Sequence, residues 1–416
     1  MVDQSRKNSR ASRTRLNLTQ DVFLSHNYRM MSKKTALILS GGGARGAYQV
    51  GVLKGLAEIL KSKKIDNPFK ILSGVSAGAI NTAMLACSPD GFSASVEKLI
   101  YLWSQIKSDQ VYQVNLLSLN KISLKSLLSG GKNLKFNSLL DTEPLRKLLS
   151  SHINFAQIEE NIKSKKYDSV IITANNYFDN AAVSFIDYNQ KTQQTWQNWN
   201  DSRRIPEYSK IVLDHVMASS AIPMLFPPIS INGADYGDGC VRNSTPCSPS
   251  LRMGADKLFV IGVRTQKPFE NTSGENKLSQ HHAPKHASFI TIMNTLLNAV
   301  LLDSVEQDVH RILRINELVR KVKEGKKVAD TKDAYLKEIP ALCISPSINI
   351  GELARQYAHR LPRIVRSSLN TFGSLDDANE IISYLMFDAD FCKKLIAYGY
   401  DDAYNSEEDI HQFFDI

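Results

Sequence analysis

Short apolar runs alternate with helix-like patterns in the first part of the chain. Residues 35–40 form an apolar run that ends in glycines and predicts a buried strand. Apolar positions between Ala47 and Leu60 then recur at helical spacing. A second strand over 69–73 is followed by a glycine-containing turn and a helix over 79–86. Two successive strand–helix units predict a parallel sheet with helices on its faces, which is an α/β fold.

Apolar runs and helical spacing also predict how the rest of the chain is organised. Four further strands are predicted, over 169–173, 182–186, 258–263 and 341–345. No Pro/Ser-rich linker and no internal repeat divides the chain after residue 34. We therefore predict one main domain over 35–345. Residues 346–416 carry helical patterns, and we expect them to form a helical C-terminal extension packed on that domain.

Positive charge is concentrated at the N-terminus. Residues 1–34 contain eight Lys or Arg against two Asp, which accounts for +6 of the chain's net charge of +9. A segment of this composition predicts a solvated, disordered tail. Attraction to anionic lipid headgroups or to nucleic acid is the alternative. Of these, we keep peripheral contact with an anionic membrane surface as an expectation and expect no nucleic-acid partner.

Composition excludes several classes of protein. The five cysteines are scattered without a C-x-x-C pair, which argues against a disulfide framework or a zinc site and favours a reducing compartment. The chain has no uninterrupted apolar stretch near 18 residues and no signal-peptide pattern at its start. We expect a soluble, cytoplasmic protein without a metal or another cofactor.

A G-x-S-x-G sequence, residues 74–78, lies between the second strand and its helix, with Ser76 at its centre. A serine at a tight strand-to-helix turn is pushed out of the backbone, and flanking glycines permit the turn. The following helix directs its N-terminal amides at the site, where they favour a developing alkoxide. Ser76 is therefore a candidate nucleophile. An ordinary Gly/Ser turn is the alternative, and the placement disfavours it.

A glycine-rich loop, residues 41–46, follows the first strand and opens the first helix. Consecutive glycines expose backbone N–H groups, which suit an oxyanion or a phosphate. A dinucleotide site would need an acidic residue at the end of the next strand, but Asp66 precedes that strand. The next strand leads into Ser76 instead. An anion-binding loop followed by a serine turn predicts acyl transfer.

A third candidate lies far downstream, in a turn formed by Gly237, Asp238 and Gly239 and followed by Cys240. A tight turn of this kind presents the carboxylate of Asp238. Taken alone, an aspartate between two glycines is typical of many turns. Its meaning depends on the other two motifs.

Together the three motifs resemble those of the patatin-like phospholipase family, in particular its bacterial members. They occur in the family's order: G-G-G-x-R-G after the first strand, G-x-S-x-G after the second, and an aspartate in a D-G-[GA] turn. Segments 218–223, 227–228 and 254–256 extend the resemblance over roughly residues 33–265, and a weaker likeness continues toward the C-terminus.

The resemblance implies a three-layer α/β/α fold with a central, mostly parallel sheet. It also implies lipid acyl hydrolysis of the phospholipase A or lysophospholipase type, carried out by a Ser–Asp dyad without a catalytic histidine. By matching motifs, Ser76 is the nucleophile and Asp238 the general base. The implied oxyanion hole comprises Gly42, Gly43, Ala44 and Arg45, and the other motif glycines are Gly41, Gly46, Gly74, Gly78 and Gly239. Cys240 departs from the family, which has Gly or Ala at that position.

The implied chemistry sets a requirement on Asp238. An aspartate with a pKa near 4 is a weak base toward a serine hydroxyl. Apolar surroundings would raise that pKa, and the glycine loop would stabilise charge on the carbonyl oxygen as it forms. The reaction then runs through an acyl-enzyme that water hydrolyses, with Asp238 activating the water. Arg45 either stabilises the developing charge or is a surface residue at the first turn of its helix.

Two alternatives stay open at this point. A Ser-His-Asp α/β-hydrolase would need a histidine C-terminal to the acid, and the chain offers His281, His282, His286, His310, His359 and His411. A lipid-binding protein of the same fold that has lost its activity is the second. The presence of Ser76, Asp238 and the glycine loop argues against that alternative.

Overall fold

The computed structural model describes residues 33–114, 138–190, 199, 203–265, 288–301, 304–325, 337–372 and 374–416. Thr35–Ile416 form one compact unit, and Met1–Lys34 are assigned to another. The basic tail predicted for residues 1–34 lies outside the described residues except for its last two positions.

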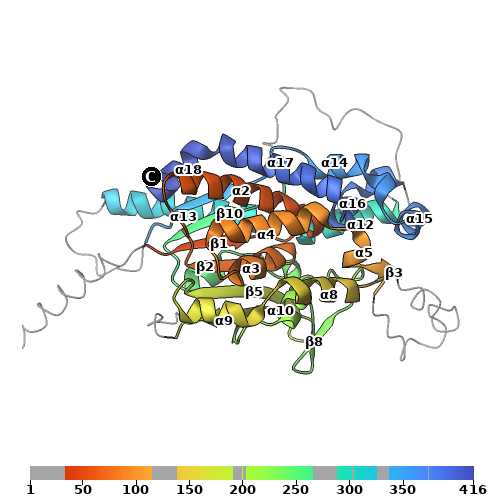
Figure 1. Ribbon diagram of the computed structural model, residues 1–416, viewed down its shortest axis with the longest axis horizontal. Helices are drawn as coiled ribbons and strands as arrows, with labels where there is room; N and C mark the ends of the chain where they lie inside the picture. Colours follow the sequence, from red (N-terminus) through yellow and green to blue (C-terminus); the bar gives the residue numbers. More distant parts are fainter. Residues whose placement is uncertain are drawn as a thin grey trace, which may run out of the picture. The chain divides into compact units, whose positions relative to one another are not determined.

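A sheet of nine strands runs through the described part of the unit that begins at Thr35, in the order β11-β10-β1-β2-β5-β6-β7, with β9 beside β5 and β8 beside β9 (Figure 1). The strands from β11 to β5 are mutually parallel, as are β6 and β7. The pairs β5–β6, β5–β9 and β8–β9 are antiparallel. The predicted mostly parallel sheet is therefore confirmed. The strands are β1 (Thr35–Leu39), β2 (Ile71–Val75), β5 (Ser169–Asn176), β6 (Ala181–Tyr188), β7 (Arg204–Tyr208), β8 (Ile229–Ile231), β9 (Ala234–Asp238), β10 (Lys257–Ile261) and β11 (Ala341–Ile344).

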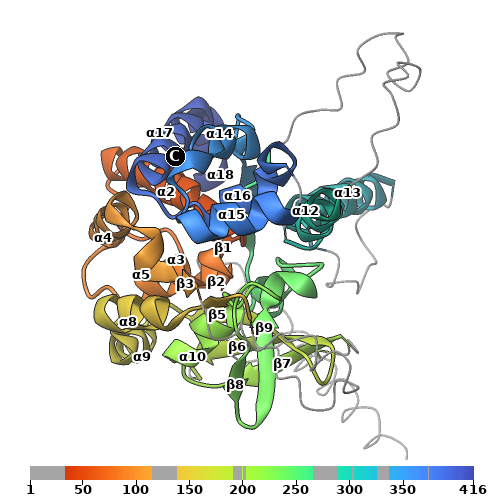
Figure 2. The ribbon, with the colours of Figure 1, turned by 90° about the vertical axis from the view of Figure 1, so that its right-hand side faces the viewer.

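Both faces of the sheet are buried, because alternate residues of its parallel strands enter two different cores. In β1, Leu37 and Leu39 join the larger core, whereas Ala36 and Ile38 join the smaller one. Figure 2 shows α4 (Phe92–Gln105) on one side of the sheet and α13 (Ser304–Gly325) on the other. Helices on both faces of one sheet make the three-layer α/β/α arrangement that the sequence resemblance implied.

The remaining helices of the described chain surround these layers. The segment from Gly43 to Arg252 contains α2 (Gly46–Ser62), α3 (Ala77–Ala86), α5 (Ser108–Val111), α8 (Glu143–His152), α9 (Phe155–Lys163), α10 (Leu213–Ser219) and α11 (Ser248–Arg252), with the short η1 (Gly43–Arg45) and η2 (Gly239–Val241). The C-terminal part contains α12 (Phe289–Leu301), α14 (Ile350–Gln356), η4 (Ala358–Arg360), α15 (Arg363–Phe372), η5 (Leu375–Ala378), α16 (Asn379–Leu385), α17 (Ala389–Asn405) and α18 (Glu407–Phe414). A separate pair of short strands joins β3 (Gln113–Val114) to β4 (Leu140–Asp141).

The C-terminal helices pack against the N-terminal ones. Helix α17 lies along α2, and the two run side by side in Figure 1. The buried hydroxyl of Tyr48 on α2 donates a 2.9 Å hydrogen bond to the carboxylate of Asp402 on α17. Residues from both ends of the chain therefore share one core. No helix in the described ranges is long and apolar enough to cross a membrane.

Candidate active site

Strand order brings the first two motifs together. Strands β1 and β2 are parallel neighbours, so the segments that follow them meet at the same edge of the sheet. The glycine loop follows β1, and Ser76 follows β2. A Cβ atom at Gly41 would lie 2.9 Å from the Cβ of Ser76, so the loop and the serine are in direct contact.

Ser76 occupies a strained turn between β2 and α3. Its φ of 55° and ψ of −126° are rare for a residue with a side chain. The chain turns so sharply that α3 begins against the backbone of β1. A Cβ at Gly78 would lie 2.2 Å from the carbonyl oxygen of Leu39, so only glycine fits there. The predicted strand-to-helix turn is therefore present, with Ser76 at its apex.

Two consecutive serines hold this turn in place: Ser219 is the last residue of α10, and Ser220 follows it. The backbone N–H of Ser76 donates to Ser219 Oγ at 2.9 Å, and Ser220 Oγ donates to the Ser76 carbonyl at 3.2 Å. Ser219 Oγ in turn donates to the carbonyl of Thr173 on β5 at 2.6 Å. In the sequence, segment 218–223 was notable only because it resembles the corresponding segment of the family. No sequence pattern indicated that these hydroxyls support the backbone of Ser76.

Asp238 reaches the same edge of the sheet from the other direction. It ends β9, which pairs antiparallel with the last residues of β5 and places Asp238 opposite Ala174. Ser76 Oγ donates a 2.6 Å hydrogen bond to Asp238 Oδ2. The other carboxylate oxygen accepts the backbone N–H of Cys240 at 2.9 Å. Two residues from distant motifs thus form a direct serine–carboxylate pair.

Burial changes the acidity of this carboxyl group. Asp238 is 0% exposed, and desolvation raises its pKa to about 6. Hydrogen bonds from Ser76 and Cys240 stabilise the charged form and lower the pKa, opposing part of that rise. A carboxylate of this pKa is a stronger base than an exposed aspartate and is still mostly ionised at neutral pH.

The glycine loop presents unengaged amides beside the serine. Within the described chain, the backbone N–H groups of Gly42, Gly43 and Ala44 form no hydrogen bond to another backbone group, whereas that of Arg45 bonds to the Gly42 carbonyl at 3.1 Å. Gly43 lines the same cavity as Ser76. Amides placed next to a nucleophile in this way suit an oxyanion.

Comparison with known proteins shows which family the chain belongs to. Residues 37–251, just over half of the chain, match the family model described as patatin-like phospholipase. This chain belongs to the patatin-like phospholipase family. The region that defines the family therefore runs from β1 to α11 and contains Ser76, Asp238 and the glycine loop.

Two curated relatives are similar over the same part of the chain. The uncharacterized protein YjjU of Escherichia coli K12 is 25% identical over 232 residues, which are 55% of this chain and 51% of YjjU. The probable lipid hydrolase 463L of Invertebrate iridescent virus 6 is 27% identical over 234 residues, 55% of this chain and 69% of the viral protein. The chain thus spans about half the length of the bacterial relative. The crystal structure of VipD from Legionella pneumophila is similar at 13% sequence identity, and the alignment covers 91% of this chain and 67% of the VipD chain. The TM-score of 0.32 is too low to support a conclusion.

Cys240 replaces the small residue that the patatin-like family has in its D-G-[GA] turn. Its side chain is buried beside the serine: a Cβ at Gly41 would lie 2.3 Å from Cys240 Sγ. Burial, together with the neighbouring charge of Asp238, raises the pKa of the thiol well above its usual value. The thiol is therefore protonated at neutral pH and able to donate to the Asp238 carboxylate.

Arg45 of the family's loop motif is buried. Its side chain is 3% exposed and contacts Glu380, Ser383 and the carbonyl of Val263. The alternative of a surface arginine at the first helical turn is thereby excluded. Glu380 and Ser383 lie on α16, beyond residues 37–251, and the sequence patterns did not indicate their part in the site.

An apolar cavity adjoins Ser76. Its volume is about 30 Å³, so it is narrow. Its lining is almost wholly hydrophobic, which suits a hydrocarbon chain rather than a polar ligand. The cavity was not predicted, because its walls come from α3, α4, α5, α8 and the segments after α10 and α16. They include Ile80, Leu102, Trp103, Ile106, Val111, Leu145, Leu149, Ile222, Phe226 and Phe387.

Within the described residues, no histidine hydrogen-bonds to Ser76 or Asp238. His215 stacks on Phe185 at 3.9 Å between ring centroids, and burial lowers its pKa to about 4. His281, His282 and His286 lie outside the described residues. Among described side chains, no group of three or more His, Cys, Asp or Glu is placed to hold a metal ion.

Proposed function

We propose that this chain is a serine lipid acyl hydrolase of the phospholipase A or lysophospholipase type, with Ser76 as nucleophile and Asp238 as general base. The observation that carries the proposal is the 2.6 Å hydrogen bond from Ser76 Oγ to a fully buried carboxylate, next to an apolar cavity. Membership of the patatin-like phospholipase family supports a lipid ester as substrate. The viral relative is itself named a probable lipid hydrolase.

The contacts support a two-step reaction. Asp238 Oδ2 accepts the Ser76 proton as Ser76 Oγ attacks the ester carbonyl carbon. The carbonyl oxygen, now negative, accepts hydrogen bonds from the amides of Gly42, Gly43 and Ala44. Collapse of this intermediate expels the alcohol, which takes the proton from Asp238. Asp238 then deprotonates a water molecule that attacks the acyl-enzyme, and return of the proton to Ser76 releases the fatty acid.

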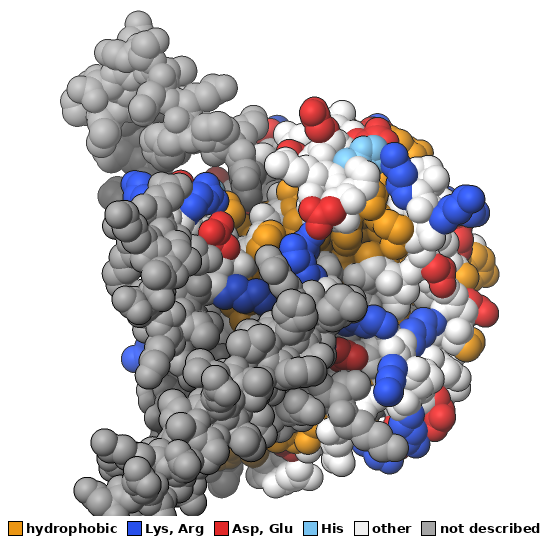
Figure 3. All heavy atoms as spheres, turned by 90° about the vertical axis from the view of Figure 1, so that its left-hand side faces the viewer, with side chains coloured by type: hydrophobic (Ala, Val, Ile, Leu, Met, Phe, Trp, Pro, Cys, Tyr) orange, Lys and Arg blue, Asp and Glu red, His pale blue; other side chains and the backbone are white. Residues whose placement is uncertain are grey.

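The proposed substrate also implies an encounter with a lipid surface. Residues 1–34 bear most of the chain's excess positive charge, and Lys or Arg near an anionic surface contribute up to about 1 kcal/mol each. On the face shown in Figure 3, basic and acidic side chains both occur across the described part. We therefore propose the N-terminal segment, rather than that face, as the element that brings the enzyme to anionic lipid.

Defined phospholipids test the proposed activity. Incubation with a phosphatidylcholine that bears different acyl chains at its two positions should yield free fatty acid, detected by mass spectrometry. Lysophospholipid should appear in an equal amount if only the diacyl lipid is cleaved, and in a smaller amount if the lyso product is cleaved as well. Prior treatment with a fluorophosphonate should block product formation, because the reagent phosphonylates an activated serine. Binding to the lipid vesicles without product would support a catalytically silent lipid-binding protein instead.

The acidity of Asp238 predicts the pH dependence of the reaction. The base must be deprotonated, and burial raises its pKa to about 6. We expect kcat/KM for a soluble ester to be level at neutral pH and to fall about tenfold per pH unit below about 6.

The Cys240→Ala variant should have a shifted pH profile. The change removes a hydrogen bond that lowers the pKa of Asp238, so the acidic limb of kcat/KM should lie at higher pH in the variant than in the wild type. Acidic limbs that coincide in the two proteins would contradict the part assigned to the thiol.

A further inference from the structure

The glycine loop is packed directly against the backbone of α16. Gly43 has a φ of 55°, and a Cβ at this position would lie 2.4 Å from the carbonyl oxygen of Tyr384. No larger residue fits between the loop and the helix. Gly43 also lines the cavity beside Ser76. A displacement of α16 would therefore displace an amide that the proposed mechanism uses.

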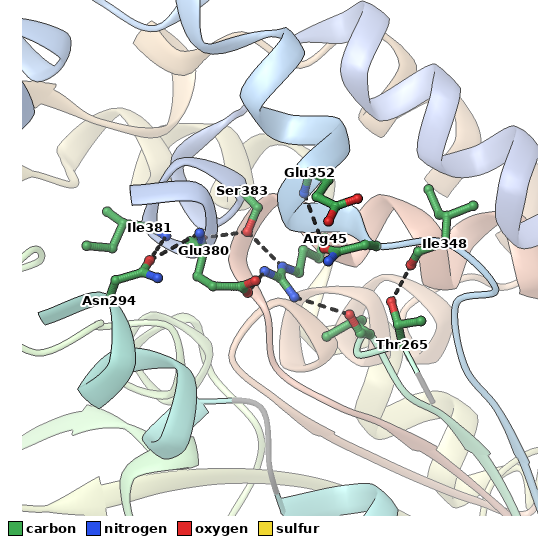
Figure 4. Close-up of polar contacts among 10 residues, drawn as sticks. Arg45, Thr265, Asn294, Ile348, Glu352, Glu380, Ile381 and Ser383 are labelled. Atoms are coloured by element: carbon green, nitrogen blue, oxygen red, sulfur yellow. Dashed lines mark hydrogen bonds and ion pairs between the residues drawn. The ribbon is translucent and has the colours of Figure 1, made fainter. Parts of the chain in front are cut away.

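Arg45 forms a second connection between the loop and α16, and its guanidinium group is engaged at all three nitrogens (Figure 4). The Nε atom donates to Ser383 Oγ at 2.8 Å, and Nη2 forms an ion pair with the Glu380 carboxylate. The Nη1 atom lies 3.5 Å from the carbonyl oxygen of Val263. The group also lies over the ring of Tyr384, 4.9 Å from its centroid. Glu380, Ser383 and Tyr384 all belong to α16, so most of the partners of the guanidinium come from this helix.

Helix α16 is itself fixed at both ends. At its N-terminus, Asn294 Oδ1 on α12 accepts the backbone N–H groups of Glu380 and Ile381, at 3.1 and 3.2 Å. At its C-terminus, the hydroxyl of Tyr112 donates to the carbonyl of Leu385 at 2.9 Å. Hydrogen bonds therefore tie both ends of this short helix to elements other than the glycine loop.

We infer that α16 positions the glycine loop for catalysis, with Glu380 as a positioning residue that acts through Arg45. This inference rests on the proposed function, because it assigns a task only if the loop amides stabilise an oxyanion. Glu380 neutralises the charge of Arg45 and holds the guanidinium group of Arg45 toward α16. Arg45 then orients the loop instead of contributing its own charge to the reaction. The catalytic unit thus extends beyond residues 37–251, which the family model covers.

The inference predicts that loosening the ion pair impairs turnover without impairing substrate binding. Glu380→Gln keeps the size of the side chain but removes its charge. We expect it to lower kcat for p-nitrophenyl butyrate at least about tenfold and to change KM less than about threefold, because small displacements of catalytic groups can cost about 10²-fold in rate. Arg45→Lys should behave similarly, since one ammonium group does not reproduce a planar fork. Rates are expressed per active site titrated with a fluorophosphonate, so that loss of folded protein does not enter kcat.

A matched control breaks another ion pair of the C-terminal region. Lys257 on β10 pairs with Asp415 at 2.6 Å, away from the glycine loop, and Asp415→Asn should leave kcat within about twofold of the wild type. A trifluoromethyl ketone supplies an independent readout, because its adduct with Ser76 places an oxyanion at the loop. Its inhibition constant should rise in Glu380→Gln in proportion to the loss of kcat/KM. A merely structural effect would not produce that proportion.

The outcomes separate this inference from the proposed function. Wild-type kcat per titrated site in Glu380→Gln, together with an inactive Ser76→Ala, would overturn the positioning role and leave the hydrolase proposal intact. An active Ser76→Ala would overturn the proposed function itself. If Glu380→Gln does not fold, Ser383→Ala decides the matter in the same way, because it removes one hydroxyl from the Arg45 contact. Unchanged kcat in that variant would also count against the inference.

Discussion

Replacing Ser76 by alanine should lower kcat for ester hydrolysis by about 10⁴-fold or more, since the variant has no nucleophile to form an acyl-enzyme. The change removes a single oxygen from a residue whose backbone is held independently by Ser219 and Ser220. We therefore expect the fold to persist. The measurement is hydrolysis of a soluble ester and of phospholipid vesicles, with circular dichroism and a thermal melt as controls.

The same variant tests whether Ser76, and not another residue, attacks the ester. Labelling by a fluorophosphonate should disappear in Ser76→Ala, because the hydroxyl that donates to the buried Asp238 carboxylate is then absent. If the variant keeps more than about a tenth of wild-type turnover, another residue performs the attack, and the assignment of Ser76 is wrong.

Asp238→Asn should be almost as damaging, with kcat reduced by about 10³-fold. An amide keeps the shape of the carboxylate but does not take up the serine proton. It also removes the negative charge toward which the Ser76 hydroxyl and the Cys240 amide are directed. The expected result is a folded protein with intact substrate binding, a normal KM and little turnover.

Histidine replacements provide the control for this result. If Asp238 acts without a histidine, each of the nine histidines changed singly to glutamine should retain at least about one-tenth of the activity. A single histidine whose loss costs about 10³-fold would restore the Ser-His-Asp alternative. His281, His282 and His286 belong in this series although they lie outside the described residues.

The turn that contains Ser76 depends on local sequence, and its position was predicted. Ser76 lies at a strand-to-helix turn, as expected, because the strand, the glycines and the helix are encoded within a few residues of it. The predicted α/β fold and its mostly parallel sheet are confirmed for the same reason: buried parallel strands read as apolar runs. The family membership inferred from the three motifs is confirmed as well.

Other features depend on pairings between distant segments, which local patterns do not encode. Strands β7, β8 and β9 were not predicted, since they are short or mixed in polarity. The position of Asp238 follows from the antiparallel pairing of β9 with β5. The ion pair between Arg45 and Glu380 joins residues separated by 335 positions, and no motif marks Glu380. The apolar cavity likewise draws its walls from helices across the chain.

The separation of Arg45 from Glu380 along the chain has a consequence for biosynthesis. A ribosome adds about 5–20 residues per second, so the 335 positions between them take roughly 20–70 s to translate. Ser76, Asp238 and the glycine loop all leave the ribosome before α16 does. On the positioning role inferred above, the nascent chain holds an incomplete oxyanion site during that interval. Such a polypeptide would meet cellular lipids as a poor catalyst until translation has passed Glu380.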